Sequence, residues 1–168
     1  SAPKSDIVYS DETGMNAQAL PFLKPEWSPD LLYAFNYFGR ITLLRRALLV
    51  KAGICDGRAG EAVEWDMNLR VNDLAQVVTR VPKILCRRAD AAKDRPSVGS
   101  EGAADARYVI ARYWKRHGFD ATATTRPDGT QSSSWPLSPE PRVSVIVPTK
   151  DKPELMRKTA EGLLCETS

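Results

Sequence analysis

The chain has 168 residues, of which 42% are apolar and 27% charged, and this composition is typical of a soluble globular protein. Its net charge of +3 is small and spread along the chain, which argues against a nucleic-acid partner. No apolar run reaches the about 18 to 20 residues of a membrane span, and the opening Ser-Ala-Pro-Lys-Ser-Asp has no hydrophobic signal core, so we expect any membrane association to come from other parts of a longer protein.

The first predicted element is a short β-strand over residues 6–9, which leads into a polar loop over 10–14. The loop contains two adjacent carboxylates, Asp11 and Glu12. They therefore follow the carboxyl end of a strand, which is the end where ligands bind in open α/β sheets. The residues alone are also compatible with a solvated turn.

Short elements follow. Ser28 can cap a helix over residues 29–36, which begins with a proline. Residues 40–46 have the pattern of a strand, and 45–53 predict a second helix closed by Gly53.

The next helix follows a loop that begins at residue 57. Apolar residues recur at three to four positions and predict a buried stripe made of Val63, Met67, Val71 and Leu74. Glu64 and Asp66 lie off this stripe, so they can face a cleft. The alternative is a helix-start pair without chemistry, because the helix dipole favours acids in the first turn.

A strand is predicted for residues 78–89, at the edge or end of a sheet because Pro82 cannot donate a ladder hydrogen bond. Residues 100–117 predict a long helix that ends at Gly118, and 119–125 alternate like a strand. The apolar side expected for the helix consists of Ala104, Tyr108, Ala111, and Trp114 or Lys115.

Residues 127–141 are rich in proline, serine and glycine, which predicts a linker. After it, 143–147 predict a nearly continuous apolar strand followed by a helix, the opening of a new α/β domain. Because an unpaired strand invites pairing, we expect that this tail strand could also be exchanged between two chains to form a dimer.

Five segments together resemble the C-terminal half of a family 2 glycosyltransferase module with the GT-A fold: DIVYSDE, FLKPEWSPDLL, NYFGRITLLRR, EWDMNLR and RVPKILCRR. Bacterial enzymes of this kind add sugars to cell-surface polysaccharides, often as tandem modules. The tail RVSVIVPTKDKPELMRKTAEGLL resembles the first strand and helix of a next module. The resemblance covers about residues 6–90 and 142–165.

The resemblance implies an α/β fold, a partial GT-A fold whose mixed sheet has flanking helices. It implies four parts: an acceptor-side half-module over 1–98, a helical extension and strand over 99–126, the linker over 127–141, and the start of a second module over 142–168. The implied function is cytoplasmic, inverting, hexosyl-type transfer from a nucleotide-sugar donor to a glycan acceptor, with the chain alone not expected to turn over. The alternative is a degenerate, non-catalytic module that binds glycan or protein.

The resemblance also implies a metal site. The family holds Mg²⁺ or Mn²⁺ with an Asp-x-Asp motif at a strand end, and the cation neutralises the leaving diphosphate. Asp11 and Glu12 are the implied ligands here, while Thr13 replaces the second aspartate of the motif.

The segment EWDMNLR implies the catalytic residues. Glu64 stands where the family has its general base, with Asp66 two residues on, and such a base removes the proton of the acceptor hydroxyl. Trp65 between them could stack on a sugar face, and Arg70 is a further implied substrate-binding residue.

Three more substrate contacts are implied. Lys24 and Trp27 could line the acceptor entrance, although Trp27 is equally suited to anchor the following helix by packing. Arg87 stands where the family has a histidine near the metal, and an arginine can hold a diphosphate by a charge-assisted fork.

The cysteines and the histidine predict no zinc site. Cys55, Cys86 and Cys165 are widely spaced and odd in number, which favours free thiols in a reducing compartment. His117, the only histidine, precedes Gly118 and suits the C-terminal end of a helix dipole.

Overall fold

The computed structural model divides the chain into two units, Ser1–Pro136 and Leu137–Ser168. The residues that it describes are 4–15, 20–53, 56–88, 102–137, 139 and 142–165. Cys55 and the first residues of the helix predicted from residue 100 lie outside this described part.

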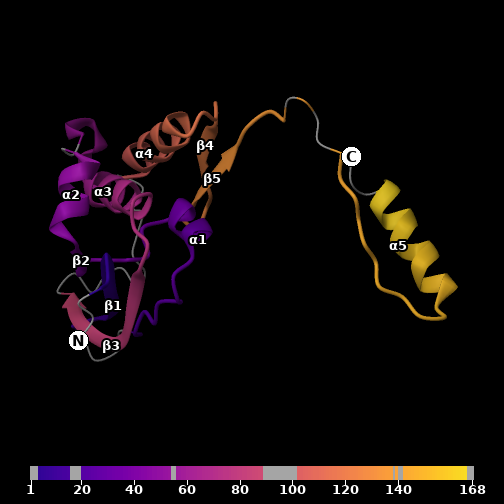
Figure 1. The fold of residues 1–168 in the computed structure, drawn as a ribbon, viewed down its shortest axis with the longest axis horizontal. Helices are drawn as coiled ribbons and strands as arrows, with labels where there is room; N and C mark the ends of the chain where they lie inside the picture. The colour runs from indigo at the N-terminus through magenta and orange to yellow at the C-terminus, as the bar shows by residue number, and fades with distance from the viewer. Residues whose placement is uncertain are drawn as a thin grey trace. The chain divides into compact units, whose positions relative to one another are not determined.

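A three-stranded mixed sheet with the order β2-β1-β3 forms the base of the first unit (Figure 1). The strands are β1 (Ile7–Gly14), β2 (Thr42–Leu44) and β3 (Val78–Arg88). β1 pairs antiparallel with β2 and parallel with β3. β3 is therefore an edge strand of this sheet, as the sequence predicted from its proline.

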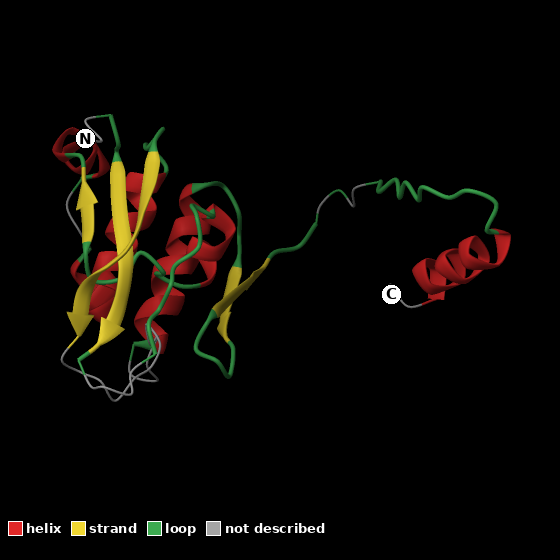
Figure 2. Ribbon diagram, turned by 90° about the horizontal axis from the view of Figure 1, so that it is seen from below, coloured by secondary structure: helices red, strands yellow, loops and turns green. Residues whose placement is uncertain are grey.

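The helices of the first unit gather on one side of this sheet in both ribbon views (Figures 1 and 2). They are α1 (Pro29–Ala34), α2 (Arg46–Ala52), the 3₁₀-helix η1 (Gly57–Ala62), α3 (Val63–Asn72) and α4 (Ala103–Arg116). The predicted α/β class, a mixed sheet with flanking helices, is thus confirmed. The caps of the short helices are also as expected, because Ser28 accepts a hydrogen bond from Leu31 N at the start of α1 and Gly53 follows α2.

The core lies between the sheet and the helices. Its buried apolar residues are Ile7, Tyr9, Leu32, Tyr37, Phe38, Ala59, Ala62, Trp65, Leu69, Val71, Ala106, Val109, Ile110 and Tyr113. The stripe predicted for α3 is only partly correct, since Val71 is buried but Leu74 is 41% exposed. Trp65 and Leu69 occupy the core instead, because α3 packs against α1, α2 and α4 and is covered on several sides.

The apolar side predicted for α4 is only partly correct, since Tyr108 and Trp114 pack half-buried against the core. The buried side consists of Ala106, Val109, Ile110 and Tyr113, and Ala104 is exposed. Tyr108 and Trp114 flank this buried side and have polar partners: the Tyr108 hydroxyl donates to Asp56 Oδ2 at 2.7 Å, and Trp114 Nε1 donates to Ser133 Oγ at 2.8 Å. The helix ends before Gly118, whose φ of 82° suits glycine, as predicted.

A β-hairpin follows α4 and corrects the predicted linker. β4 (Thr122–Thr125) was expected, but β5 (Gln131–Ser134) pairs antiparallel with it inside the stretch assigned as linker, 127–141. The connecting turn contains Gly129 with φ 85° and Asp128, which accepts a hydrogen bond from Thr130 N at 2.9 Å. This turn chemistry closes a hairpin although both strands are polar.

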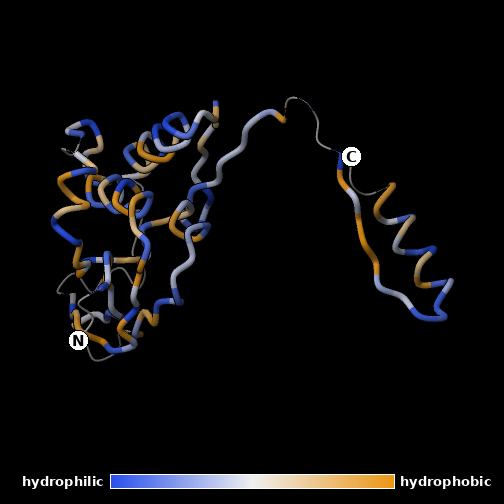
Figure 3. The backbone as a smooth tube through the Cα atoms, in the orientation of Figure 1, coloured by the Kyte–Doolittle hydropathy of each residue, from blue (hydrophilic) through white to orange (hydrophobic). Residues whose placement is uncertain are grey.

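The second unit contains the helix α5 (Pro153–Cys165), as predicted. Residues 142–149 form neither helix nor strand, so the strand predicted for 143–147 is wrong for the described chain. A strand requires a neighbour for its backbone hydrogen bonds, and the described residues of this unit contain no other strand. The apolar run before α5 (Figure 3) is exposed, with Ile146 at 91%. Exchange of this segment between chains remains a prediction.

Candidate functional site

The adjacent acids of β1 lie inside the strand and not in a loop, because β1 continues to Gly14. Asp11 is 2% exposed and Glu12 is 1% exposed. The ladder with β3 shifts register on both sides of Asp11, so that Ser10 lies opposite Val81 whereas Asp11 lies opposite Ile84. Such an irregularity redirects side chains locally, and here it occurs where β3 carries its proline.

Asp11 is held by two basic residues. Arg80 Nη2 donates to Asp11 Oδ2 at 2.8 Å and to Oδ1 at 3.1 Å, and Arg80 Nε lies 3.3 Å from Oδ1. The backbone N–H of Lys24 donates to Oδ1 at 2.9 Å. Sequence reasoning missed Arg80, although β1–β3 pairing places it opposite Tyr9, two positions from Asp11, on the same sheet face.

Glu12 is held by the side chain of Lys24. Lys24 Nζ lies 3.3 Å from Glu12 Oε2 and donates to the carbonyl of Phe38 at 2.6 Å. The backbone N–H of Arg40 also donates to Glu12 Oε2, at 3.3 Å. Burial lowers the pKa of Lys24, and the neighbouring Glu12 offsets part of this shift by favouring the charged ammonium.

The two residues expected at an acceptor entrance have different surroundings. Lys24 is 2% exposed and is committed to the contacts described above. Trp27 is 44% exposed, and its indole Nε1 donates to Asn72 Oδ1 at 2.9 Å. Trp27 is thus anchored to α3 and still presents surface to solvent, so both of its expected roles stay open.

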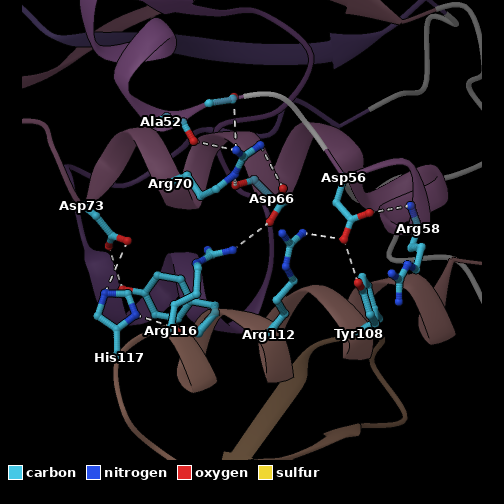
Figure 4. A network of polar contacts seen from close by, with 12 residues as sticks. Ala52, Asp56, Arg58, Asp66, Arg70, Asp73, Tyr108, Arg112, Arg116 and His117 are labelled. Carbon is cyan, nitrogen blue, oxygen red and sulfur yellow. Dashed lines mark hydrogen bonds and ion pairs between the residues drawn. The ribbon is translucent and has the colours of Figure 1, made fainter.

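The acids of α3 point in different directions, since residues two apart on a helix do not face each other. Glu64 is exposed, whereas Asp66 is completely buried. Asp66 Oδ2 lies 3.0 Å from Arg70 Nη2, and Asp66 Oδ1 lies 3.3 Å from Arg116 Nη1 (Figure 4). The structure therefore places Asp66 as an ion-paired contact between α3 and α4 and leaves Glu64 at the surface.

Trp65 and Arg70 also take part in packing. Trp65 is 3% exposed and its Nε1 donates to the carbonyl of Leu32 at 2.8 Å, so its ring presents no face to a sugar. Arg70 Nη1 donates to the carbonyls of Ala52 at 2.7 Å and Gly53 at 3.2 Å (Figure 4). Arg70 thereby joins the end of α2 to α3.

A row of polar contacts docks α4 (Figure 4). Beside the Asp66 pair, it consists of Asp56 with Tyr108 and Arg112, and Asp73 with Tyr113 and His117. The hydrogen bond from Tyr108, then the backbone N–H of Arg58 and the charge of Arg112, lower the pKa of Asp56. Sequence reasoning did not find these contacts because the partners are 40 to 56 residues apart.

The remaining candidate, Arg87, is exposed on β3 opposite Thr13. It is Arg80, and not Arg87, that contacts Asp11. Within the described part of the chain, no group of three or more His, Cys, Asp or Glu side chains could hold a metal ion. Mg²⁺ and Mn²⁺ prefer several oxygen ligands, and two acids that are already paired with cations do not fit this need. Binding of Mg²⁺ or Mn²⁺ stays a prediction that the residues present do not favour.

Two further expectations concern the whole chain. Cys86 and Cys165 are free thiols, as predicted. Among the residues that the structure describes, no helix combines the length and the apolar character that a membrane crossing requires.

The fold and site define an α/β protein with a buried acidic pair in its central strand, and two known proteins are similar to it. Over 98% of this chain, it is 31% identical to the O-antigen biosynthesis protein RfbC of Myxococcus xanthus and 26% identical to the uncharacterized protein y4gI of Sinorhizobium fredii. The chain spans only 13% and 19% of the lengths of these relatives. No protein-family model and no solved structure matches it.

Proposed function

We propose that the chain is part of a polysaccharide-biosynthesis protein and belongs to a module that transfers a sugar from a nucleotide-sugar donor to a glycan acceptor. The observation that carries this proposal is the 31% identity, over 98% of the chain, to an O-antigen biosynthesis protein. The five segments that resemble a family 2 glycosyltransferase support it, because the resemblance extends to their order and separation in the chain. A nucleotide-sugar donor also favours a cytoplasmic site.

Glu64 is the proposed general base. Its carboxylate is exposed in the first turn of α3, where an acceptor hydroxyl can reach it. In an inverting transfer, Glu64 takes the proton of that hydroxyl as its oxygen bonds to the anomeric carbon, while the bond from this carbon to the nucleoside diphosphate breaks. Asp66 acts as a positioning residue, because it fastens the same helix to Arg116 of α4.

The donor diphosphate requires positive charge. Arg87 is exposed at the end of β3, and its planar fork suits phosphate oxygens. Trp27 is the aromatic surface proposed for the acceptor, since part of its ring remains accessible above α3.

A transfer assay on the full-length gene product tests the proposal. Labelled UDP-, GDP- and dTDP-sugars are supplied with an oligosaccharide acceptor, and nucleotide release and labelled product are measured. Glu64→Gln should lower the rate by about 100-fold or more if Glu64 is the base. Glu61→Gln is the matched control, because Glu61 is an exposed neighbour just before α3. A rate equal to wild type in Glu64→Gln would refute the assigned role, and a folded protein inactive with every donor would refute the transfer reaction.

A non-catalytic module for glycan or protein binding is the second candidate. It is favoured by the pairing of Asp11 and Glu12 with cations and by Thr13 at the second acid position of the motif. Glycan-array binding without nucleotide, together with inactivity in the transfer assay, would favour this module over the enzyme.

A further inference from the structure

The surroundings of Asp11 and Glu12 in β1 bear on whether this place can bind a divalent cation. Two acids, Asp11 and Glu12, face two basic side chains, Lys24 and Arg80, and the nearest N–O distances are 3.3 Å for the Lys24–Glu12 pair and 2.8 Å for the Arg80–Asp11 pair. The charges of these four side chains sum to zero, and a further carboxylate, Glu26, lies 3.6 Å from Arg80 Nη1 but is exposed to solvent. A divalent cation added there would leave two positive charges uncompensated in a buried place, which is strongly unfavourable.

The space around Glu12 is also filled. Gly39 has φ 74°, and a Cβ on it would overlap Glu12 Oε2 and Lys24 Nζ. The ammonium of Lys24 reaches the carbonyl of Phe38 at 2.6 Å, so it lies between the carboxylate and the neighbouring backbone. The place that a cation would take beside this oxygen is thus occupied by the protein's own ammonium.

The same contacts fasten a long segment to the sheet. Glu12 and Phe22 exchange backbone hydrogen bonds at 2.8 and 3.3 Å, and the Tyr9 hydroxyl donates to the carbonyl of Pro25 at 2.7 Å. The contacts of Lys24 and Arg40 with the two acids continue this attachment to residue 40. The segment 22–40 includes α1 and is therefore held to β1 by Asp11 and Glu12 together with the packing of Tyr9 against Tyr37 and Phe38.

We propose that Asp11, Glu12, Lys24 and Arg80 form a charge-neutral clamp that fixes residues 22–40 on the sheet and that binds no divalent cation. The two basic residues supply the positive charge that a metal would otherwise bring to the acids. The inference concerns metal dependence and stands whether or not the longer protein transfers sugar.

The experiment is a titration of the 168-residue chain with MnCl₂, followed by the amide signals in ¹⁵N NMR spectra. Paramagnetic Mn²⁺ broadens the signals of nearby amides, and the N–H groups of Lys24 and Arg40 point at Asp11 and Glu12. We expect both signals to persist up to about 1 mM Mn²⁺, the weak end of known Ca²⁺ sites. The same result is expected with UDP present. Selective, saturable broadening of these two signals in either titration would overturn the clamp.

Variants sharpen the result without being required for it. If the two signals broaden selectively, Asp11→Asn should abolish the broadening when Asp11 is a ligand, and this loss would show which acid holds the cation. Asp30→Asn is the control, because Asp30 is an exposed aspartate on α1. Thr13→Asp restores the second acid of the family motif, and we expect it to remain without Mn²⁺ binding, since Lys24 and Arg80 stay in place.

Discussion

Two acidic pairs that are similar in sequence have contrasting environments in the fold. Asp11 and Glu12 on β1 are both buried and paired with basic side chains, whereas on α3 Asp66 is buried and Glu64 is exposed. All three buried acids serve packing between segments distant in sequence. Of these four carboxylates, only Glu64 is exposed to solvent, which is why it is the one proposed to meet a substrate.

The difference follows from backbone geometry. On a helix, positions two apart diverge, so one acid of α3 turns to the Arg70 and Arg116 side chains while the other turns to solvent. On β1, the register of the pairing with β3 shifts at Asp11, and the segment 22–40 lies against the strand, so that both acids are buried. A pair of acids therefore indicates chemistry only after burial and partners are known.

Removing the charge of Lys24 should cause the largest loss in the free energy of unfolding. Lys24→Met leaves the buried carboxylate of Glu12 without its ammonium, and breaking a buried ion pair on one side costs about 3 to 5 kcal/mol. Urea denaturation of the variant measures the loss. Lys115→Met is the control, because Lys115 is exposed on α4 and should change stability by no more than about 0.5 kcal/mol. Equal stability of the two variants would show that the clamp around Glu12 contributes little.

A side chain added at Gly39, beside Glu12 and Lys24, should cause the next largest loss of stability. Gly39→Ala forces a side chain into a positive φ and against Glu12 and Lys24. Gly118→Ala has the same backbone problem, with φ 82°, but meets no atom within 4 Å. The positive φ costs about 1 to 2 kcal/mol of stability in each of the two variants. Overpacking adds about 1 to 3 kcal/mol in Gly39→Ala alone. If chemical denaturation gives equal losses for both, the space beside Glu12 is not filled as described.

The two acids of α3, Asp66 and Glu64, should differ in how much their substitution lowers the free energy of unfolding. Asp66→Asn removes the charge that holds Arg70 and Arg116, and hydrogen bonds to charged groups are worth about 1.5 to 3 kcal/mol. Glu64→Gln should change stability by less than about 0.5 kcal/mol, because Glu64 is exposed. A large loss in Glu64→Gln, or none in Asp66→Asn, would reverse the assigned roles.

Much of the fold was accessible from sequence because its signals are local. Ser28 accepts from Leu31 N three residues on, Gly53 and Gly118 have φ above 80°, and Pro82 indicates an edge strand. The hairpin strand β5 was missed because its residues are polar and gave no apolar alternation.

The site was less accessible because its partners are remote. Arg80 is 69 residues from Asp11 and Arg116 is 50 residues from Asp66, so neither contact can be inferred without the strand pairing and the docking of α4. The length of β1 was underestimated for the same reason, since Asp11 and Glu12 are tolerated in a buried strand only because Lys24 and Arg80 pair with them. Burial of Trp65 likewise depends on its bond to Leu32, which a helix pattern does not show.

An acid at the start of β1 provides the mildest test of the comparison. Asp6 accepts hydrogen bonds from Gln76 N at 2.8 Å and Val77 N at 3.0 Å, and these bonds, with a weaker contribution from Arg45, lower its pKa below the ordinary value of 3.8. A carboxylate whose pKa is lower in the folded chain than in the unfolded chain stabilises the fold at pH values above its unfolded-state pKa. This stabilisation is lost as the pH falls through the lower pKa of the folded state.

Asp6→Asn should therefore lower the melting temperature by a few degrees near neutral pH, and the difference from wild type should shrink as the pH falls below 3.8. Circular dichroism melts of both proteins over this range measure it. Because Asp6 is only half-buried, the charge should matter less than that of Asp11 or Glu12. A difference that stays constant down to about pH 2 would mean that Asp6 acts through its shape and not through its charge.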